Sequence, residues 1–88
     1  MIYSVEYTKG ALRDLKRLDR QTAALIIGWI EKNLVGCTDP RAKGKGLTAN
    51  RGGQWRYRVG DYRIIADIDD GRIIISVLTV GHRSEVYR

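Results

Sequence analysis

Three arginines, one histidine and one tyrosine are the residues of this chain best suited to chemistry: Arg56, Arg58, Arg63, His82 and Tyr87. A guanidinium group stays charged at physiological pH and binds two phosphate oxygens at once, so it can hold a phosphodiester and stabilise charge that develops on it. His82 can transfer a proton near neutral pH. Such a set, with no need for a metal or a cofactor, suits RNA cleavage by attack of the ribose 2′-OH on the adjacent phosphate. DNA lacks that hydroxyl, so RNA would be the substrate.

Each of these residues also has a simpler interpretation. Basic side chains on the exposed face of a small sheet are often only solvated. A lone histidine such as His82, after a strand-ending glycine, is often a surface residue, and Tyr87 could pack rather than react. The pattern alone leaves these alternatives open.

The net charge of +6 comes from 16 Lys and Arg against ten Asp and Glu, and its placement is uneven. Residues 41–63 contain seven basic residues against Asp61 alone, a local excess of six, which equals that of the whole chain. A concentrated excess indicates a surface for a polyanion rather than general solubilising charge. The basic residues are Arg41, Lys43, Lys45, Arg51, Arg56, Arg58 and Arg63. We assign Lys43, Lys45 and Arg51 to RNA or phosphate binding; the alternatives for this loop are an acidic protein segment or no partner at all.

The 88 residues suffice for one small domain, which we place at 1–88. Cys37 is the only cysteine and His82 the only histidine, so an internal disulfide and a Cys/His zinc site are excluded. No apolar run approaches the roughly 18 residues of a membrane span, and no signal peptide is evident. We therefore expect a cytoplasmic protein with no membrane partner.

The first half of the chain predicts a strand followed by two helices. Residues 2–7 are β-prone, and Thr8 offers a side-chain cap for a first helix. Asp19 offers a cap for a second helix, in which apolar residues recur at helical spacing up to Gly36. Two antiparallel helices with a short connection are expected.

The second half predicts a three-stranded meander after a basic loop at 41–53. The strands cover 54–59, 62–69 and 72–80, and the connections are the dipeptides Gly60-Asp61 and Asp70-Gly71. Such dipeptides between β-prone runs are typical of tight hairpins.

The two turns predict a register. A two-residue Gly60-Asp61 turn places Arg58 opposite Arg63 and Arg56 opposite Ile65, all on one face of the sheet. Like charges opposite each other are unfavourable, and an anion bound between them would remove that cost. Continued alternation places Ile74, Ser76, Leu78, Val80 and His82 on the same face. The other face, with Trp55, Tyr57, Val59, Tyr62, Ile64, Ala66 and Ile68, is expected to pack against the helices.

Two segments of this meander resemble a known family. The stretch 54–65 (QWRYRVGDYRII) and the stretch 80–87 (VGHRSEVY) are similar to the RelE branch of the RelE/ParE toxin superfamily. The likeness extends over the whole chain. It implies an α+β fold, a microbial-ribonuclease-like β-α-α-β-β-β domain, with the helical hairpin packed on one face of a four-stranded, mainly antiparallel sheet.

The resemblance also implies a function. The chain would be the toxin of a type II toxin–antitoxin system, an mRNA interferase that cleaves mRNA in the ribosomal A site and so inhibits translation. Its partners would be the ribosome with mRNA and a RelB-like antitoxin with an acidic segment. Operator DNA would be bound only through the antitoxin complex.

Residue by residue, the resemblance implies roles in binding and catalysis. Arg56 and Arg58 match basic positions on the first meander strand, and Arg63 and Arg83 match arginines of the two motifs. Tyr87 matches the tyrosine near the end of the second motif. We expect Arg63, Arg83, His82 and Tyr87 to be catalytic, and Arg56 and Arg58 to bind phosphate.

One departure from the family concerns the general base. Some relatives use a lysine as the general base. This sequence has an arginine at that position, and arginine is effectively never deprotonated. His82 is therefore our choice for proton transfer, with Glu85 as the alternative.

Two other functions remain open. A ParE-like inhibitor of DNA gyrase would share the fold without the catalytic set. A bare RNA-binding module would bind RNA with steep salt dependence and never cut it.

Overall fold

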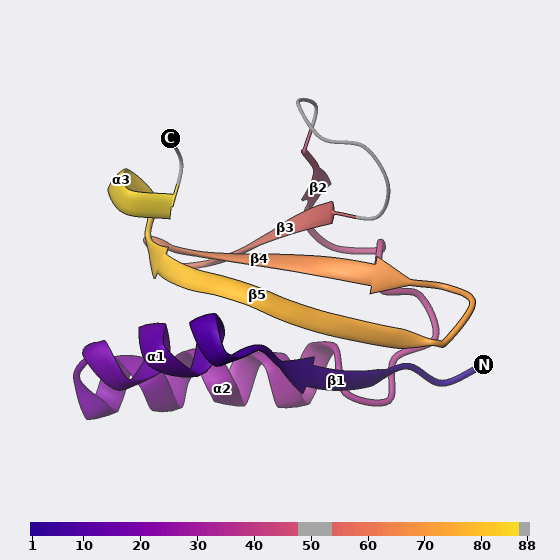
Figure 1. Cartoon of the computed structure of the whole chain (residues 1–88), viewed down its shortest axis with the longest axis horizontal. Coiled ribbons are helices and arrows are strands. Elements are labelled where there is room, and N and C mark those ends of the chain that lie inside the picture. Colours follow the sequence, from indigo (N-terminus) through magenta and orange to yellow (C-terminus); the bar gives the residue numbers. More distant parts are fainter. Residues whose placement is uncertain (48–53, 87–88) are drawn as a thin grey trace.

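The computed structural model describes residues 1–47 and 54–86, which form two helices packed against one face of a mixed sheet (Figure 1). The strand order is β1-β5-β4-β3-β2; β1 runs parallel to β5 and the other neighbours are antiparallel. The elements are β1 (Ser4–Tyr7), α1 (Lys9–Arg17), α2 (Arg20–Asn33), β2 (Lys45–Gly46), β3 (Gln54–Val59), β4 (Tyr62–Asp69), β5 (Ile74–His82) and α3 (Arg83–Val86).

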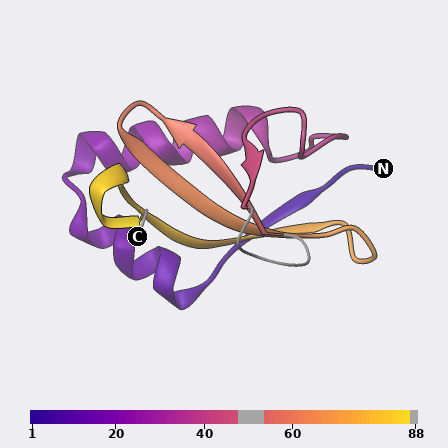
Figure 2. The same ribbon diagram turned by 90° about the horizontal axis from the view of Figure 1, so that it is seen from above.

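This arrangement confirms the predicted α+β fold with a helical hairpin on one face of the sheet. It adds two short elements that the sequence did not indicate. β2 extends the sheet to five strands, and the single-turn helix α3 follows β5 directly. Seen from above, β2 and α3 flank the face of the sheet that the helical hairpin leaves open (Figure 2). No helix in residues 1–47 and 54–86 is long and apolar enough to cross a membrane.

Both helices begin at the predicted caps. The Thr8 hydroxyl accepts a hydrogen bond from the amide of Ala11 at 3.1 Å, and the Asp19 carboxylate accepts one from the amide of Thr22 at 3.1 Å. These bonds satisfy amide groups that the first turn of a helix leaves without an intrahelical acceptor. After α2, Gly36 adopts a left-handed φ of 77°, and its amide donates to the carbonyl of Tyr3 at 2.9 Å. That bond ties the end of the hairpin to the segment that leads into β1.

The core lies between the hairpin and the sheet. Tyr57 and Ile64 from the meander and Ile26 and Ile30 from α2 are almost fully buried there. Trp55 and Tyr62 pack against the same core from partly exposed positions, whereas Val59, Ala66 and Ile68 are buried in it. The predicted helix-facing side of the meander is thus confirmed, and the face opposite is left for Arg56, Arg58 and Arg63.

The predicted two-residue Asp70-Gly71 turn is wrong. The connection has four residues, 70–73, because Asp69 pairs with Ile74. The Asp69 carboxylate accepts a hydrogen bond from the amide of Arg72 at 3.1 Å, and Ile73 adopts a left-handed φ of 59°. The two additional loop residues preserve the alternation, so Ile74 and Ser76 lie on the arginine face as predicted.

A β-bulge then reverses the alternation of β5. Thr79 pairs with Ile65, but Val77 pairs with Ala66, which leaves Leu78 as an extra residue. Val80 therefore lies opposite Ile64 and is buried in the core, and His82 lies opposite Tyr62. The predicted placement of Val80 and His82 on the arginine face is wrong for this reason.

Helix α1 holds the bulge in place. The Thr8 hydroxyl lies 3.1 Å from the carbonyl oxygens of both Val77 and Leu78, to which it donates. The Asp14 carboxylate accepts a hydrogen bond from the amide of Val80 at 2.9 Å. The side chains of the cap residue Thr8 and of Asp14 in α1 thus satisfy the backbone groups that the irregular ladder exposes.

We expect Asp14→Ala to destabilise the fold by about 1–3 kcal/mol, because the amide of Val80 would lose its charged acceptor in a partly buried place. Urea denaturation of the purified protein measures the change. Lys16→Ala, an exposed substitution on the same helix, is the control and should stay within about 0.5 kcal/mol of the parent. Equal stability of the two variants would show that Asp14 does not hold the bulge.

Candidate phosphate-binding site

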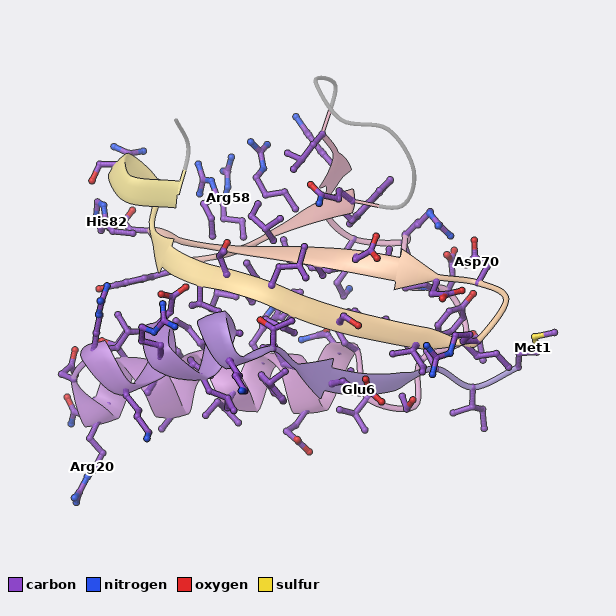
Figure 3. The ribbon with its side chains drawn as sticks, in the orientation of Figure 1. Met1, Glu6, Arg20, Arg58, Asp70 and His82 are labelled. Atoms are coloured by element: carbon purple, nitrogen blue, oxygen red, sulfur yellow. The ribbon has the colours of Figure 1, made fainter. Side chains whose placement is uncertain are left out.

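The predicted arginine pair across the β3–β4 hairpin is present. Arg58 pairs with Arg63, and Arg56 pairs with Ile65, as the two-residue Gly60-Asp61 turn requires. Gly60 adopts a left-handed φ of 61°, which a glycine provides at no steric cost. Arg58 is exposed and extends from the face of the sheet away from the helices (Figure 3). Arg63 lies deeper, with only 6% of its surface exposed.

Three other guanidinium groups act on that of Arg63 at this position. Burial lowers the pKa of Arg63, and the positive charges of Arg58, Arg56 and Arg83 lower it further, whereas Asp61 opposes them. Arg83 is brought here by its backbone, since its amide donates to the carbonyl of Asp61 at 2.9 Å. We call this set, Arg56, Arg58, Arg63 and Arg83, the arginine cluster. A bound anion would relieve the mutual repulsion, so the cluster is suited to hold a phosphate.

His82 lies at the end of β5 beside α3 (Figure 3). Its ring packs edge to face against Tyr62, with 5.6 Å between ring centroids. Nδ1 lies 3.0 Å from the Ser84 hydroxyl and accepts a hydrogen bond from the Ser84 amide at 3.3 Å. In the neutral ring this arrangement assigns the proton to Nε2. Within the described residues, the ring thus contacts Tyr62 and Ser84 rather than the arginine cluster.

Two further predicted site residues, Arg51 and Tyr87, lie outside the described residues. Glu85, the alternative base, belongs to α3. The predicted roles of Arg51, Tyr87, Glu85 and His82 stay predictions.

A second basic feature borders the arginine cluster. A pocket of about 550 Å³ lies at the β3 edge, between α2 and the segment that contains β2. Arg56 and Arg58 belong both to its lining and to the arginine cluster. The other lining residues are Trp29, Asn33, Lys43, Gly44 and Lys45. We call this feature the basic pocket; it places the predicted Lys43 and Lys45 together with the arginines of β3.

Two aromatic side chains of β3 fix the loop that forms one wall of the basic pocket. The indole Nε1–H of Trp55 donates to the carbonyl of Lys43 at 2.6 Å. The Tyr57 hydroxyl, which is buried, donates to the carbonyl of Pro40. Burial raises the pKa of Tyr57 well above its ordinary value, so this donor keeps its proton.

Gly44 allows the loop to approach the sheet. It adopts a left-handed φ of 81°, and a Cβ at this position would lie 2.2 Å from the carbonyl oxygen of Arg56 and 2.8 Å from the indole nitrogen of Trp55. No other residue fits there without movement of the backbone. The loop wall thus requires glycine at this position.

An ion pair anchors the start of the same loop. The Arg41 guanidinium donates two hydrogen bonds to the Asp70 carboxylate, at 3.0 and 3.1 Å, and lies 5.9 Å from the ring centroid of Trp55. The Tyr3 hydroxyl donates to the same carboxylate at 2.7 Å. The hydrogen bonds from Arg41 have the largest effect and the bond from Tyr3 the next largest, and together they hold the pKa of Asp70 below its usual range. Arg41 therefore has a structural partner, whereas the exposed Lys43 and Lys45 form no ion pair with any residue that the structure describes.

Sequence reasoning missed the pocket residues Trp29 and Asn33 and the anchor Asp70. Trp29 and Asn33 are four residues apart, so they lie on one face of α2, and the Asn33 amide nitrogen donates to the carbonyl of Trp29 at 2.9 Å. An indole on a helix otherwise rich in aliphatic residues was the available signal. Among the described residues, no group of three His, Cys, Asp or Glu side chains is arranged to hold a metal ion.

Comparison with known proteins adds an independent observation. A profile of the family described as "ParE toxin of type II toxin-antitoxin system, parDE" matches residues 5–87. Toxin RelG of Mycobacterium tuberculosis is 33% identical over 88 residues, which cover 100% of this chain and 99% of the relative. Toxin RelE of the same organism is 35% identical over 86 residues, which cover 98% of this chain and 87% of the relative.

Solved structures agree with these sequence relatives. A chain of the crystal structure of the toxin–antitoxin complex RelBE2 from Mycobacterium tuberculosis superposes with a TM-score of 0.83 at 30% identity, covering 97% of this chain and 95% of the other. The isolated RelE toxin of E. coli superposes with a TM-score of 0.74 at 21% identity, covering 97% and 90%, and supports the fold.

We expect inorganic phosphate to raise the melting temperature above that in sodium chloride at equal ionic strength, by about 4 °C or more, because the arginine cluster binds the anion only in the folded state. Differential scanning fluorimetry measures this shift. Arg63→Ala should lose most of it, whereas Arg72→Ala, on the exposed β4–β5 loop, should keep it. The same melting temperature in both salts would argue against a specific anion site.

We expect Asp70→Asn to weaken the fold at neutral pH and to remove part of its acid sensitivity. Because the pKa of Asp70 is lowered on folding, its contribution is complete above the ordinary carboxyl pKa of about 3.9 and is lost as the pH falls through the lowered value. Thermal unfolding between pH 7 and pH 2 should show the two curves converging below about pH 4. Asp67→Asn, an exposed change on β4, is the control. If Asp70→Asn lowers the melting temperature by the same amount at every pH, the ionic contribution is excluded.

Proposed function

Because this chain belongs to the ParE toxin family of type II toxin–antitoxin systems, we propose that it is a ribosome-dependent mRNA endoribonuclease of the RelE type. Membership confirms the resemblance predicted from residues 54–65 and 80–87, and it makes the chain a toxin of such a system. The observation that carries the step to a nuclease is the arginine cluster, with the buried Arg63 at its centre. Three cations gathered around one buried guanidinium support a site that holds a phosphate and stabilises charge developing on it.

In the proposed reaction the ribose 2′-OH of the mRNA attacks the adjacent phosphorus. A bond forms between the 2′ oxygen and phosphorus, and the bond from phosphorus to the 5′ oxygen breaks, which leaves a 2′,3′-cyclic phosphate. One proton leaves the 2′-OH and one is delivered to the departing 5′ oxygen. Arg63 and Arg83 stabilise the additional negative charge on the phosphate oxygens, and Arg56 and Arg58 hold the strand in position.

In this proposal, His82 transfers the proton. Because Nδ1 is engaged by Ser84, Nε2 is the nitrogen that would exchange the proton with substrate. His82 lies opposite Tyr62 and precedes Arg83, at the end of β5 that leads into α3. Glu85 is the alternative for this step, and Tyr87 would orient the nucleotide.

The proposed partners follow from the same assignment. Structural relatives have been crystallised as toxin–antitoxin complexes, so we propose a RelB-like antitoxin whose acidic segment covers the basic surface. Operator DNA would be contacted only through that complex. A toxin whose target is the translating ribosome acts in the cytoplasm, where we place it.

A second candidate is favoured by the description of the matching profile, which names ParE. A ParE-like toxin would inhibit DNA gyrase without cleaving nucleic acid. The two functions differ in which process stops first.

We expect Arg63→Ala to abolish growth inhibition while the protein stays folded, because the cluster loses its buried guanidinium. Loss of one preorganised charge-stabilising group costs about 100- to 1,000-fold in rate. Pulse labelling after induction, with primer extension on a reporter mRNA, measures both effects. For the parent, protein synthesis should stop first, with cuts confined to translated codons.

Arg20→Ala is the matched control and should keep full toxicity, since Arg20 points away from the helical layer, on the other side of the sheet from Arg58 (Figure 3). Circular dichroism of both variants checks the fold. If DNA synthesis stops first and the reporter stays intact, the gyrase reading replaces the nuclease proposal. A folded Arg63→Ala variant that still cuts mRNA would remove Arg63 from the catalytic set.

A further inference from the structure

We propose that the basic pocket is a nucleotide subsite, in which Trp29 stacks on a base of the single-stranded RNA and Lys43, Lys45 and Arg58 hold its phosphate. The inference rests on the proposed function, because it takes the bound strand to be the one positioned on the arginine cluster. It adds a second binding position beside the cleavage site.

The charge of the pocket selects an anion. Two lysines and two arginines line it, and no carboxylate does. Within the described residues, the side chains of Lys43, Lys45 and Arg58 form no ion pair, whereas Arg41 is bound to Asp70. Three cations are therefore available to a ligand at the mouth of one pocket.

An aromatic side chain in the pocket lining indicates which kind of anion the pocket binds. One lining residue is Trp29, which is only half-buried although its ring also packs against Tyr57, with centroids 5.6 Å apart and planes tilted by 52°. Tyr57 contacts the indole of Trp29 from the core side, so the indole is a rigid surface rather than a mobile side chain. Base–aromatic stacking on such a ring, next to cations for the phosphate, is the usual way to bind single-stranded nucleic acid.

Asn33 supplies a polar group beside the indole. Its amide nitrogen is used, because it donates to the carbonyl of Trp29 at 2.9 Å, and this bond leaves the amide oxygen as an acceptor. An acceptor next to a stacking surface suits an amino group on a base edge. Carboxylate side chains of an acidic peptide would pair with the cations but would place no planar ring on the indole, so we favour RNA.

The pocket is also formed in advance of binding. Its volume of about 550 Å³ falls within the roughly 300–1,000 Å³ of small-ligand sites. The Trp55 bond to Lys43 and the close approach of Gly44 to Arg56 fix the loop wall. Its second wall is strand β3, which β2 pairs only at Trp55 and Arg56. Arg56 and Arg58 connect it to the arginine cluster, so one strand can occupy both.

The test uses a short single-stranded RNA with 2′-O-methyl riboses, which cannot be cleaved by 2′-OH attack, and a second copy that lacks one base. Isothermal titration calorimetry gives the Kd of each for the parent, Trp29→Leu and Trp29→Phe. We expect Trp29→Leu to weaken binding of the intact RNA by about ten-fold, and Trp29→Phe to restore most of it. The abasic RNA should bind all three proteins alike, because the stacking partner is gone.

The cations are tested separately, with variants that leave the core intact. Lys43→Gln combined with Lys45→Gln should weaken RNA binding and reduce its salt dependence, whereas Lys9→Gln combined with Lys16→Gln, exposed changes on α1, should not. Equal Kd values for the parent and Trp29→Leu would overturn the subsite. So would tight binding of an acidic peptide, lost in the lysine variant, with RNA binding unchanged; the pocket would then bind a protein.

Failure of the nuclease proposal gives a different result. If the chain does not cleave mRNA but binds the 2′-O-methyl RNA through Trp29, the subsite stands and the nuclease proposal does not. If mRNA is cut at the same positions and the Kd for RNA is the same in the parent and in Trp29→Leu, the nuclease proposal stands and the subsite does not.

Discussion

The two-residue turn at Gly60-Asp61 forces Arg58 and Arg63 into opposition, and the functional half of the molecule is organised around that pairing. Once the turn is closed, strand alternation leaves no other position for these side chains: Tyr57 and Ile64 must enter the core, and the arginines must take the opposite face. The helical hairpin supplies the free energy that keeps the arrangement closed, because it buries the apolar face of the same two strands. A charged site is thereby maintained by apolar contacts on the other side of a single sheet.

The basic segment divides its charge between structure and binding. Arg41 is neutralised by Asp70 and covers Trp55, and so fixes the start of the loop that presents Lys43 and Lys45. Trp55 and Tyr57 each combine an apolar body with a polar donor, which lets them pack toward the core and still hold the loop backbone. The basic pocket therefore depends on the residues between the arginines of β3, not only on the arginines themselves.

Sequence reasoning recovered what local rules determine. The caps at Thr8 and Asp19, the hairpin at Gly60-Asp61 and the inward face of β3 and β4 each follow from residue type and spacing within a few positions. The bulge at Leu78 does not, because its cause is distant in the chain: Thr8 and Asp14 of α1 satisfy the backbone groups of Val77, Leu78 and Val80. The basic pocket was missed for the same reason, since its walls come from α2, the loop and β3.

The bulge also determines which residue of β5 lies opposite Arg63 near α3. Without it, His82 would project from the arginine face beside Arg63; with it, the ring turns to Tyr62 and its Nδ1 is used by Ser84. Gly81, which has no side chain, takes the place opposite Arg63 instead. That exchange leaves no β5 side chain at the register position opposite the buried Arg63. The contacts of α1 on the covered side of the sheet thus set which β5 residue pairs with the arginine cluster.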